Sequence, residues 1–232
     1  MSRERFLSRV RESAAAGRAY SVHLRGDLPP DAGYCGAGDD LVARLAEEIG
    51  AVGGQAYVVA DIDQARTVLA RLLEQHSVCC ALCWEHPLLA RLGLSDLLAE
   101  LGVERLDHGK LLALERSRQR KAMLAADVGI SSVSFAVAET GTLALASTAG
   151  QERLASLAPP IHIAVVEASQ VLPDLFDLFR RIEADGGEQM ASNWALITGP
   201  SKTGDIELTL TTGVHGPGTW HVVIVRKNSK EP

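Results

Sequence analysis

The chain has 232 residues, of which 47% are hydrophobic and 22% are charged, and its formal net charge is −6. This length and composition support a sizeable core without disulfides or metals, so global disorder is excluded. The negative charge argues against nucleic-acid binding through a general positive field, and no apolar run approaches the ~20 residues of a membrane-spanning helix. We expect a globular protein that binds neither nucleic acid nor membrane, and the lack of an export signal predicts a cytoplasmic location.

The first 55 residues are predicted to form a helical cap packed on the rest of the chain. An amphipathic helix is expected over 2–16, with apolar side chains on one face and arginines on the other. A second helix is expected to begin after Asp39 or Asp40, run through Ile49 and end near Gly53. The intervening segment 20–38 is rich in glycine and proline and is predicted to be a loop.

Residues 56–228 are predicted to form a single α/β domain. A buried strand over 56–60, a helix that begins at Asp61 and a buried strand over 78–84 make a β-α-β unit, which implies a parallel sheet covered on both faces. Residues 85–128 are expected to be mostly helical. Further strands are predicted over 132–138, 142–147, 161–166, 194–198, 206–212 and 220–225, with a helix over 173–185.

The cysteines indicate free thiols in a reducing compartment. Cys79, Cys80 and Cys83 share one apolar segment, with Cys35 far from them, whereas a secreted disulfide framework spreads its cysteines through loops. In a strand, Cys80 and Cys83 point to opposite faces, and zinc or iron–sulfur sites need further ligands at short spacing. We predict structural thiols and no metal site, and the sequence leaves open whether the three clustered cysteines have a redox role.

The first polar motif is Glu139-Thr140-Gly141-Thr142, at a predicted turn between two strands. Gly141 permits a positive φ and close approach of the backbone to a ligand. Thr140 and Thr142 add hydroxyls, and a partly buried Glu139 has the chemistry of a base or nucleophile. The alternative is an ordinary polar turn with a satisfied glutamate.

The second motif, over 199–207, directly follows a predicted strand. It lacks the lysine position of a phosphate-binding loop, since Asp205 stands after the second glycine. Its backbone amides, the hydroxyls of Ser201 and Thr203, and the Lys202 ammonium are nevertheless suited to surround an anion. Asp205 and Glu207 beside Lys202 indicate either a fixed ion network or an acid–base pair.

The third motif is Gly213-Val214-His215-Gly216-Pro217-Gly218, again between predicted strands. His215 can act as an acid, a base or a hydrogen-bond donor, or it can be an exposed residue of a hairpin turn. Ligands of open α/β sheets bind in loops at strand ends, so the three motifs are predicted to converge on one cleft. Glu139, Asp205 and His215 are the catalytic candidates. The candidate ligand-binding residues are Thr140, Gly141, Thr142, Arg153, His162, Gly199, Ser201, Lys202, Thr203, Glu207 and Gly216.

A basic run lies on the predicted helix over 115–126. It comprises Arg116, Arg118, Arg120 and Lys121. The run is either a solvated helix face or a surface for an anion or a partner.

The succession of Ala138–Leu143, Arg153, Pro160 with His162, Gly199–Glu207 and Gly213–Pro217 resembles the LUD (lactate-utilisation) domain family, especially its lactate utilisation protein C group. The resemblance covers about 128–226 and implies a three-layer α/β/α sandwich of the NagB/RpiA/CoA-transferase-like type. It also implies a role in oxidising L-lactate to pyruvate, alongside partner proteins that carry the iron–sulfur clusters. Lys202 stands where the family more often has Arg, and Lys lacks the bidentate fork of a guanidinium.

Three functions are compatible with this sequence. The first is a lactate-oxidation component that binds a small anionic metabolite or cofactor and acts with iron–sulfur partner proteins, itself carrying no cofactor. The second is an independent transferase or isomerase that uses Glu139 or Asp205. The third is a non-catalytic scaffold or ligand sensor that docks a partner through the basic helix. The apolar helices are compatible with a homodimer, although no interface signature marks one.

Overall fold

The computed structural model describes residues 3–19, 36–185, 191–204 and 210–226. Contacts divide the chain into two units, Met1–Cys35 and Gly36–Pro232. The first contains helix α1 (Arg3–Ala19). The second contains all the other elements, including α2 (Leu41–Ala51). The predicted cap over 1–55 therefore includes one helix of each unit.

A six-stranded parallel sheet forms the centre of the larger unit, in the order β1-β12-β7-β4-β2-β3. Its strands are β1 (Gln55–Val59), β12 (Thr219–Val225), β7 (Ile161–Glu167), β4 (Val128–Ser131), β2 (Cys80–Cys83) and β3 (Glu104–Leu106). Ile161 pairs with Thr219 on one side and with Val128 on the other. The amino ends of β12, β7 and β4 therefore lie at one level, along one edge of the sheet.

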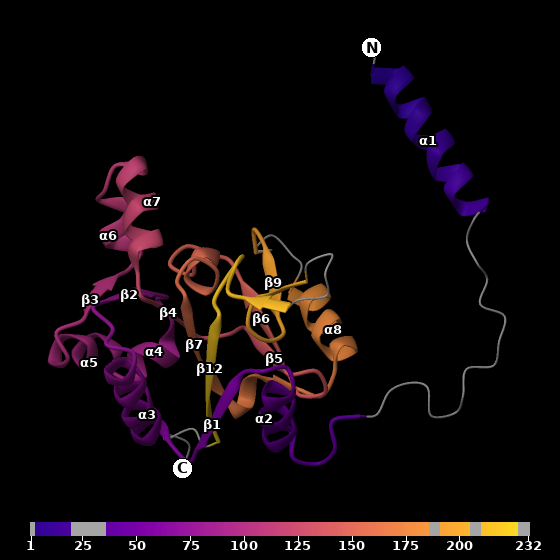
Figure 1. Cartoon of the computed structure of the whole chain (residues 1–232). Coiled ribbons are helices and arrows are strands. Elements are labelled where there is room, and N and C mark those ends of the chain that lie inside the picture. The colour runs from indigo at the N-terminus through magenta and orange to yellow at the C-terminus, as the bar shows by residue number, and fades with distance from the viewer. Residues whose placement is uncertain (1–2, 20–35, 186–190, 205–209, 227–232) are drawn as a thin grey trace. The chain divides into compact units, whose positions relative to one another are not determined.

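Helices cover the sheet on both faces. Helix α3 (Ile62–Gln75) lies on one side of β1 and β12 and α2 lies on the other, as Figure 1 shows. Asp40 caps α2 by accepting from the Ala43 amide, and Asp61 caps α3 by accepting from the Gln64 amide. These caps satisfy amides that have no partner within the helix. The predicted helix starts are confirmed at both aspartates.

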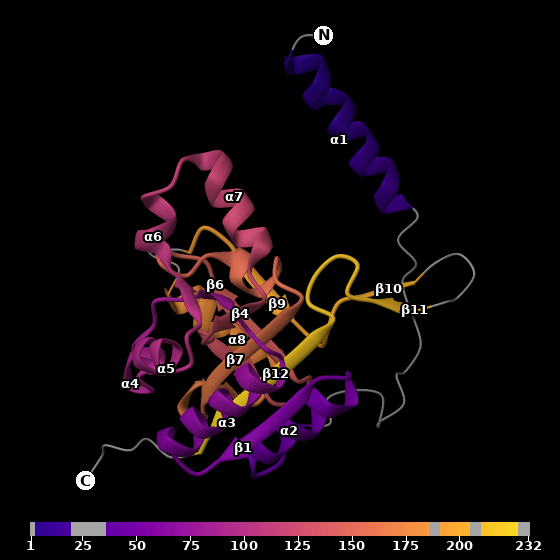
Figure 2. The same cartoon turned by 60° about the vertical axis from the view of Figure 1, so that its left-hand side comes forward.

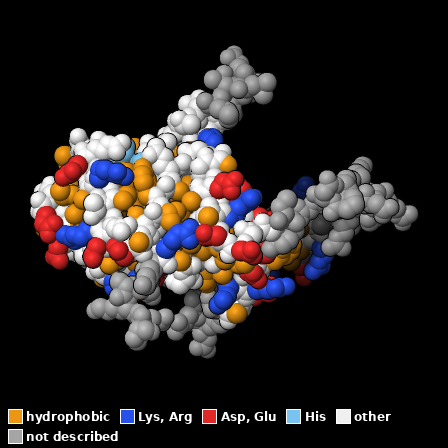
Figure 3. All heavy atoms as spheres, turned by 90° about the horizontal axis from the view of Figure 1, so that it is seen from below, with side chains coloured by type: hydrophobic (Ala, Val, Ile, Leu, Met, Phe, Trp, Pro, Cys, Tyr) orange, Lys and Arg blue, Asp and Glu red, His pale blue; other side chains and the backbone are white. Residues whose placement is uncertain are grey.

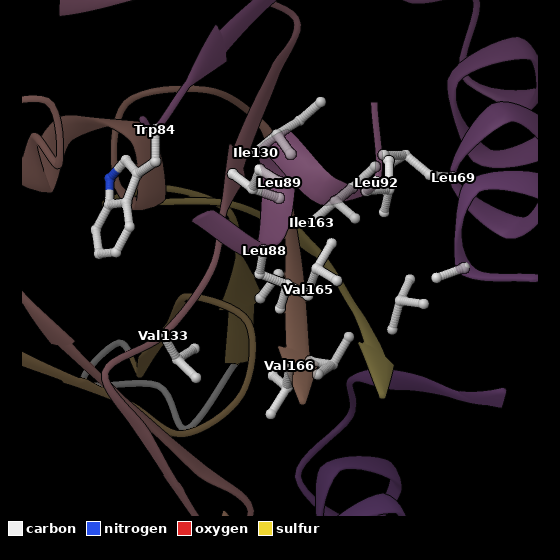
Figure 4. Close-up of a cluster of buried hydrophobic side chains, with 14 of the residues drawn as sticks. Leu69, Trp84, Leu88, Leu89, Leu92, Ile130, Val133, Ile163, Val165 and Val166 are labelled. Atoms are coloured by element: carbon white, nitrogen blue, oxygen red, sulfur yellow. The ribbon is translucent and has the colours of Figure 1, made fainter. Parts of the chain in front are cut away.

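Short helices complete the face that carries α3. They are α4 (Pro87–Arg91) and α5 (Leu94–Glu100), while α6 (His108–Leu112) and α7 (Arg116–Ala125) rise beyond the sheet edge (Figures 1 and 2). Leu88 and Leu89 of α4 point toward Ile130, Ile163 and Val165 of the central strands (Figure 4). All five side chains are buried, so apolar burial fixes α4 on the sheet.

A second, four-stranded sheet contributes to the opposite layer, in the order β8-β5-β6-β9. Its strands are β8 (Val171–Leu172), β5 (Phe135–Val137), β6 (Thr142–Ala146) and β9 (Trp194–Ile197). Helix α8 (Leu175–Asp185) packs on it through the fully buried Leu178. The mixed α/β class with a parallel central sheet is confirmed, and one of its outer layers includes this sheet.

The remaining elements are short. They are the 3₁₀ helices η1 (Arg153–Ser156) and η2 (Ala168–Gln170), and the ribbon of β10 (Lys202–Gly204) with β11 (Leu210–Thr212). The predicted strand over 206–212 lies partly outside the described residues. Residues 85–128 are less helical than predicted, since they include β3 and lead directly into β4, whose four residues are all buried.

The surface gathers no single sign of charge on the face seen from below, where acidic, basic and apolar side chains are mixed (Figure 3). Among the described residues, no helix is both long and apolar enough to cross a membrane.

Candidate functional site

A pocket of about 210 Å³ lies at the amino ends of β7 and β12, beside the carboxyl end of β9. Four segments enclose it: the end of η1, the start of β7, the segment from β9 to Ser201, and the loop that leads into β12. The lining residues are Ser156, Leu157, His162, Leu196, Ile197, Thr198, Gly199, Pro200, Ser201, His215, Gly216, Pro217 and Trp220. This volume is smaller than the 300–1,000 Å³ typical of pockets for drug-sized ligands, which favours a small metabolite.

Two of the three predicted motifs meet in this pocket. The Ser201 amide donates to the Pro217 carbonyl at 2.8 Å, and the Gly213 amide donates to the Ser201 carbonyl at 2.9 Å. These bonds join the loop that follows β9 to the loop that precedes β12. Gly199, Ser201, His215 and Gly216 therefore line one space, as does His162. Their roles toward a ligand remain predictions.

His162 forms part of the pocket wall and is fully buried. Its Nε2 lies 2.8 Å from the hydroxyl of Ser131, and its Nδ1 has no hydrogen-bond partner among the described residues. Burial disfavours the charged imidazolium and lowers the pKa of His162 to about 3. His162 is therefore neutral at physiological pH and contributes no positive charge to the pocket.

Trp220 closes the neighbouring wall. A Cβ at Gly54 would lie 2.4 Å from the Trp220 ring, so only glycine lets the chain after α2 pass this indole. The backbone of Gly199 has a positive φ of 92°, and a Cβ there would lie 2.9 Å from the Val52 carbonyl oxygen. The turn after α2 therefore fixes two parts of the pocket wall from outside.

The Glu139–Thr142 turn does not line this pocket. Thr140 Oγ1 lies 2.7 Å from Thr142 Oγ1, which in turn lies 2.8 Å from Thr198 Oγ1. Gly141 has a φ of 65°, and a Cβ there would lie 2.8 Å from the backbone of Glu48 in α2. The structure thus brings the turn against α2, and its hydroxyls bond to one another and to Thr198, which does line the pocket.

The two predicted cations also lie outside the lining. Lys202 Nζ donates to the Val52 carbonyl at 2.7 Å, which satisfies the end of α2. Arg153 is exposed at the start of η1. Thr203 lies in β10, and Asp205 and Glu207 lie outside the described residues. Within the described part of the chain, the pocket wall therefore includes neither lysine nor arginine.

Cys79, Cys80 and Cys83 are not among the residues that line the pocket, and Cys35 lies outside the described residues. Cys83 is buried, Cys80 is half-buried and Cys79 is exposed, and all three are free thiols. Burial raises the pKa of Cys83 to about 12 and that of Cys80 to about 11. Both thiols are thus protonated and poorly nucleophilic at neutral pH. The described residues contain no group of three or more His, Cys, Asp or Glu side chains placed to hold a metal ion.

Several lining residues were missed by the sequence analysis. Ser156 and Leu157 follow Arg153, which was predicted instead, and Trp220 is the second residue of β12, the strand after the third motif. Thr198 immediately precedes Gly199. Their closeness in sequence to predicted site residues was the signal that could have identified them. Apolar residues such as Leu196 carry no chemical signature of a site.

A second hollow of about 300 Å³ lies at the carboxyl end of β2, where ligands of open α/β sheets commonly bind. It is lined in part by Glu85, His86 and Arg105. Arg105 already donates to the Ser95 hydroxyl at 2.5 Å and lies 3.6 Å from a carboxylate oxygen of Asp107. Its guanidinium is thus engaged within the protein, and the pocket at the amino ends of the strands is the better candidate.

Comparison with known proteins identifies the family. The family model described as "LUD domain" matches residues 42–225. The chain belongs to the LUD domain family. The matched range begins in α2 and ends in β12, so it includes every segment that lines the pocket.

Two relatives of this LUD chain share most of its length. It is 31% identical over 223 residues to "Lactate utilization protein C" of Halalkalibacterium halodurans, covering 93% of this chain and 94% of that one. It is also 29% identical over 180 residues to the protein of the same name from Shouchella clausii, covering 77% and 76%. A shorter similarity, 34% over 120 residues, joins half of this chain to 24% of "Lactate utilization protein B" from Shouchella clausii.

A solved structure shares the fold of this LUD chain. The crystal structure of a DUF162 family protein from Deinococcus radiodurans superposes with a TM-score of 0.54 at 21% identity, covering 80% of this chain and 96% of that one. The arrangement of sheet and helices is thus one that an experimental structure also shows.

Proposed function

We propose that this chain is a component of lactate utilisation, the oxidation of L-lactate to pyruvate, and that it binds a small anionic metabolite in the pocket between β9 and β12. The observation that carries the proposal is the near full-length similarity to the relative from Halalkalibacterium halodurans that is named for lactate utilisation. The LUD family match over residues 42–225 includes the pocket and both loops that form it.

The pocket supports a small carboxylate as the ligand. Its volume of about 210 Å³ favours a small ligand, and Ser201 and His215 supply polar side chains at its wall. Because His162 is neutral and Lys202 bonds to Val52, the anion would be held by hydrogen bonds and dipoles rather than by a buried ion pair. Such a site avoids the cost of desolvating two opposite charges, and it favours moderate affinity and ready release.

We propose further that partner proteins carry the iron–sulfur clusters and that this chain has no cofactor of its own. Electrons from the oxidation then pass to those partners. The similarity to a segment of "Lactate utilization protein B" supports a shared system. The free thiols of Cys79, Cys80 and Cys83 support a location in the reducing cytoplasm.

The transferase or isomerase alternative receives no support from the described residues, which include Glu139 but not Asp205. It assigns the reaction to Glu139 or Asp205. Glu139 lies in the turn that packs on α2, outside the pocket lining. A ligand-binding scaffold without catalysis uses the same pocket as the favoured function, and turnover by the reconstituted system separates the two.

A gene deletion tests the proposal. We expect the deletion strain to grow poorly on L-lactate as sole carbon source and normally on glucose, and the wild-type gene to restore growth. Gly216→Val places a side chain beside Ser201 in the pocket, where a Cβ would lie 3.3 Å from that of Ser201. We expect this variant not to restore growth. Normal growth of the deletion strain on L-lactate would rule the proposal out.

A further inference from the structure

A groove of about 510 Å³ runs between α7 and η1. From α7 it is lined by Arg116, Gln119, Arg120, Met123 and Leu124, and from η1 and the residues after it by Leu154 and Ala158. The α7 residues recur at intervals of three and four, so they form one face of the helix. The groove is basic at the start of α7 and apolar toward its end.

Helix α7 is less buried than helix α3. None of its residues is fully buried, whereas α3 has four. Leu124 is 60% exposed, and Leu154 across the groove is 38% exposed. Exposed apolar side chains that line one groove with charged residues at its end are typical of a protein-binding surface.

The charges of the groove are available to a partner. Within the described residues, neither Arg116 nor Arg120 forms an ion pair, and the groove lining includes no acidic side chain. The chain as a whole carries a net charge of −6. Two uncompensated guanidiniums beside leucines are therefore a local feature, and they attract carboxylates.

The groove and the ligand pocket share a wall. Leu154 and Ala158 face the groove, while Ser156 and Leu157, between them in sequence, line the pocket. This segment is held firmly against the sheet. A Cβ at Gly129 of β4 would lie 1.6 Å from the Ala155 carbonyl oxygen, so only glycine allows the contact. A partner in the groove would thus touch the other side of the wall that a pocket ligand touches.

We propose that the groove between α7 and η1 docks an acidic amphipathic helix of a partner protein. Its apolar side chains would cover Leu124 and Leu154, and carboxylates one or two turns away would pair with Arg116 and Arg120. The docking proposal rests on the proposed function in one respect, which is that the partner belongs to lactate utilisation. Docking there puts the partner against the segment after η1 that also lines the pocket.

Site-specific photocrosslinking in the native organism grown on L-lactate tests the docking. A photoreactive residue replaces Leu124 in the groove or, as a control, Phe176 on α8, which is 70% exposed. The crosslinked species are identified by mass spectrometry. We expect the probe at position 124, but not the one at position 176, to mark one other protein at an acidic helical segment.

Two charge-reversal pairs on α7 supply matched variants. Arg116→Glu with Arg120→Glu alters the groove, while Arg118→Glu with Lys121→Glu makes the same change of charge outside its lining. We expect the first pair to reduce the crosslink about tenfold and the second to change it less than twofold. Because α7 has no buried residue, both proteins should unfold at the wild-type temperature.

Several outcomes would overturn the docking proposal. They are no protein crosslink from position 124, a crosslink to lipid or to a second copy of this chain, and equal losses in the two charge-reversal pairs. Normal growth of the deletion strain on L-lactate, together with a specific crosslink in the strain that carries the probe at position 124, would refute the proposed function and leave the docking surface standing.

Discussion

Two polar, glycine-containing regions with similar residues have different roles in this protein. In the Glu139–Thr142 turn, the hydroxyls bond to one another and the glycine packs against α2. In the loops around Ser201 and Gly216, the backbones bond to each other and the side chains line a pocket. A motif of Thr, Ser and Gly thus does not indicate whether its polar groups serve the fold or a ligand. The role depends on whether the motif packs against another part of the protein or faces a pocket.

The largest expected difference between the two regions is in their glycines. Gly141→Val should lower the free energy of unfolding by about 2–5 kcal/mol, because it adds left-handed backbone strain to a clash with the backbone of α2. Gly216 has no positive φ, and a Cβ there would lie 3.3 Å from the Cβ of Ser201 and 3.9 Å from the Leu157 carbonyl oxygen, so Gly216→Ala should cost less than about 1 kcal/mol. Urea unfolding measures both, and equal losses would contradict the distinction.

The pocket wall should also make the free energy of unfolding depend on pH, through His162. The pKa of His162 is lowered from 6.5 to about 3 in the folded protein. At a pH between these two pKa values, His162 binds a proton in the unfolded chain but not in the folded chain. The free energy of unfolding therefore falls as pH falls below about 6.5. The loss from His162 alone should be about 2 kcal/mol at pH 5.

Urea unfolding at pH 7.5 and at pH 5 checks this dependence. His162→Asn removes the titrating group and should show a smaller loss between the two pH values than the wild type does. Identical pH dependence of the two proteins would mean that His162 is not the buried neutral imidazole described above.

A smaller effect is expected from the hydroxyls of the turn. Thr142 is 4% exposed and bonds to both Thr140 and Thr198. Thr142→Val keeps the shape and removes both bonds, which should cost about 1–2 kcal/mol. Ser201→Ala, in the pocket, should change stability by no more than about 0.5 kcal/mol. If the serine variant proved the less stable of the two, the assignment of roles would be reversed.

Much of the fold could be predicted from sequence because local signals fix it. Apolar runs marked strands at 56–60 and 161–166, and Asp61 marked a helix start; these agree with β1, β7 and the cap of α3 within a residue or two. The predicted burial is confirmed for β7 but wrong for β1, an edge strand in which only Val59 is buried. The strand β4 was missed. It follows α7 without a turn signal, and its burial on both faces removes the alternation that identifies a half-buried strand.

The candidate site could be predicted only in part. The meeting of the loops at 199–201 and 213–218 follows from their places at strand ends. The diversion of Lys202 to the Val52 carbonyl, and the bond between Thr142 and Thr198, join residues 150 and 56 positions apart in sequence. Such contacts depend on how the turn after α2 packs against the second sheet, and local sequence propensity does not predict that packing.

Isothermal titration calorimetry with L-lactate, pyruvate and other three- to four-carbon carboxylates measures whether the pocket between β9 and β12 binds a small anion. We expect at least one of these carboxylates to bind at one site per chain, and Gly216→Val to weaken that binding about tenfold or more. Gly50→Val, in open space on α2, should leave binding unchanged. Failure of the whole series to bind, or equal affinity in Gly216→Val and the wild type, would contradict the claim that this pocket holds the ligand.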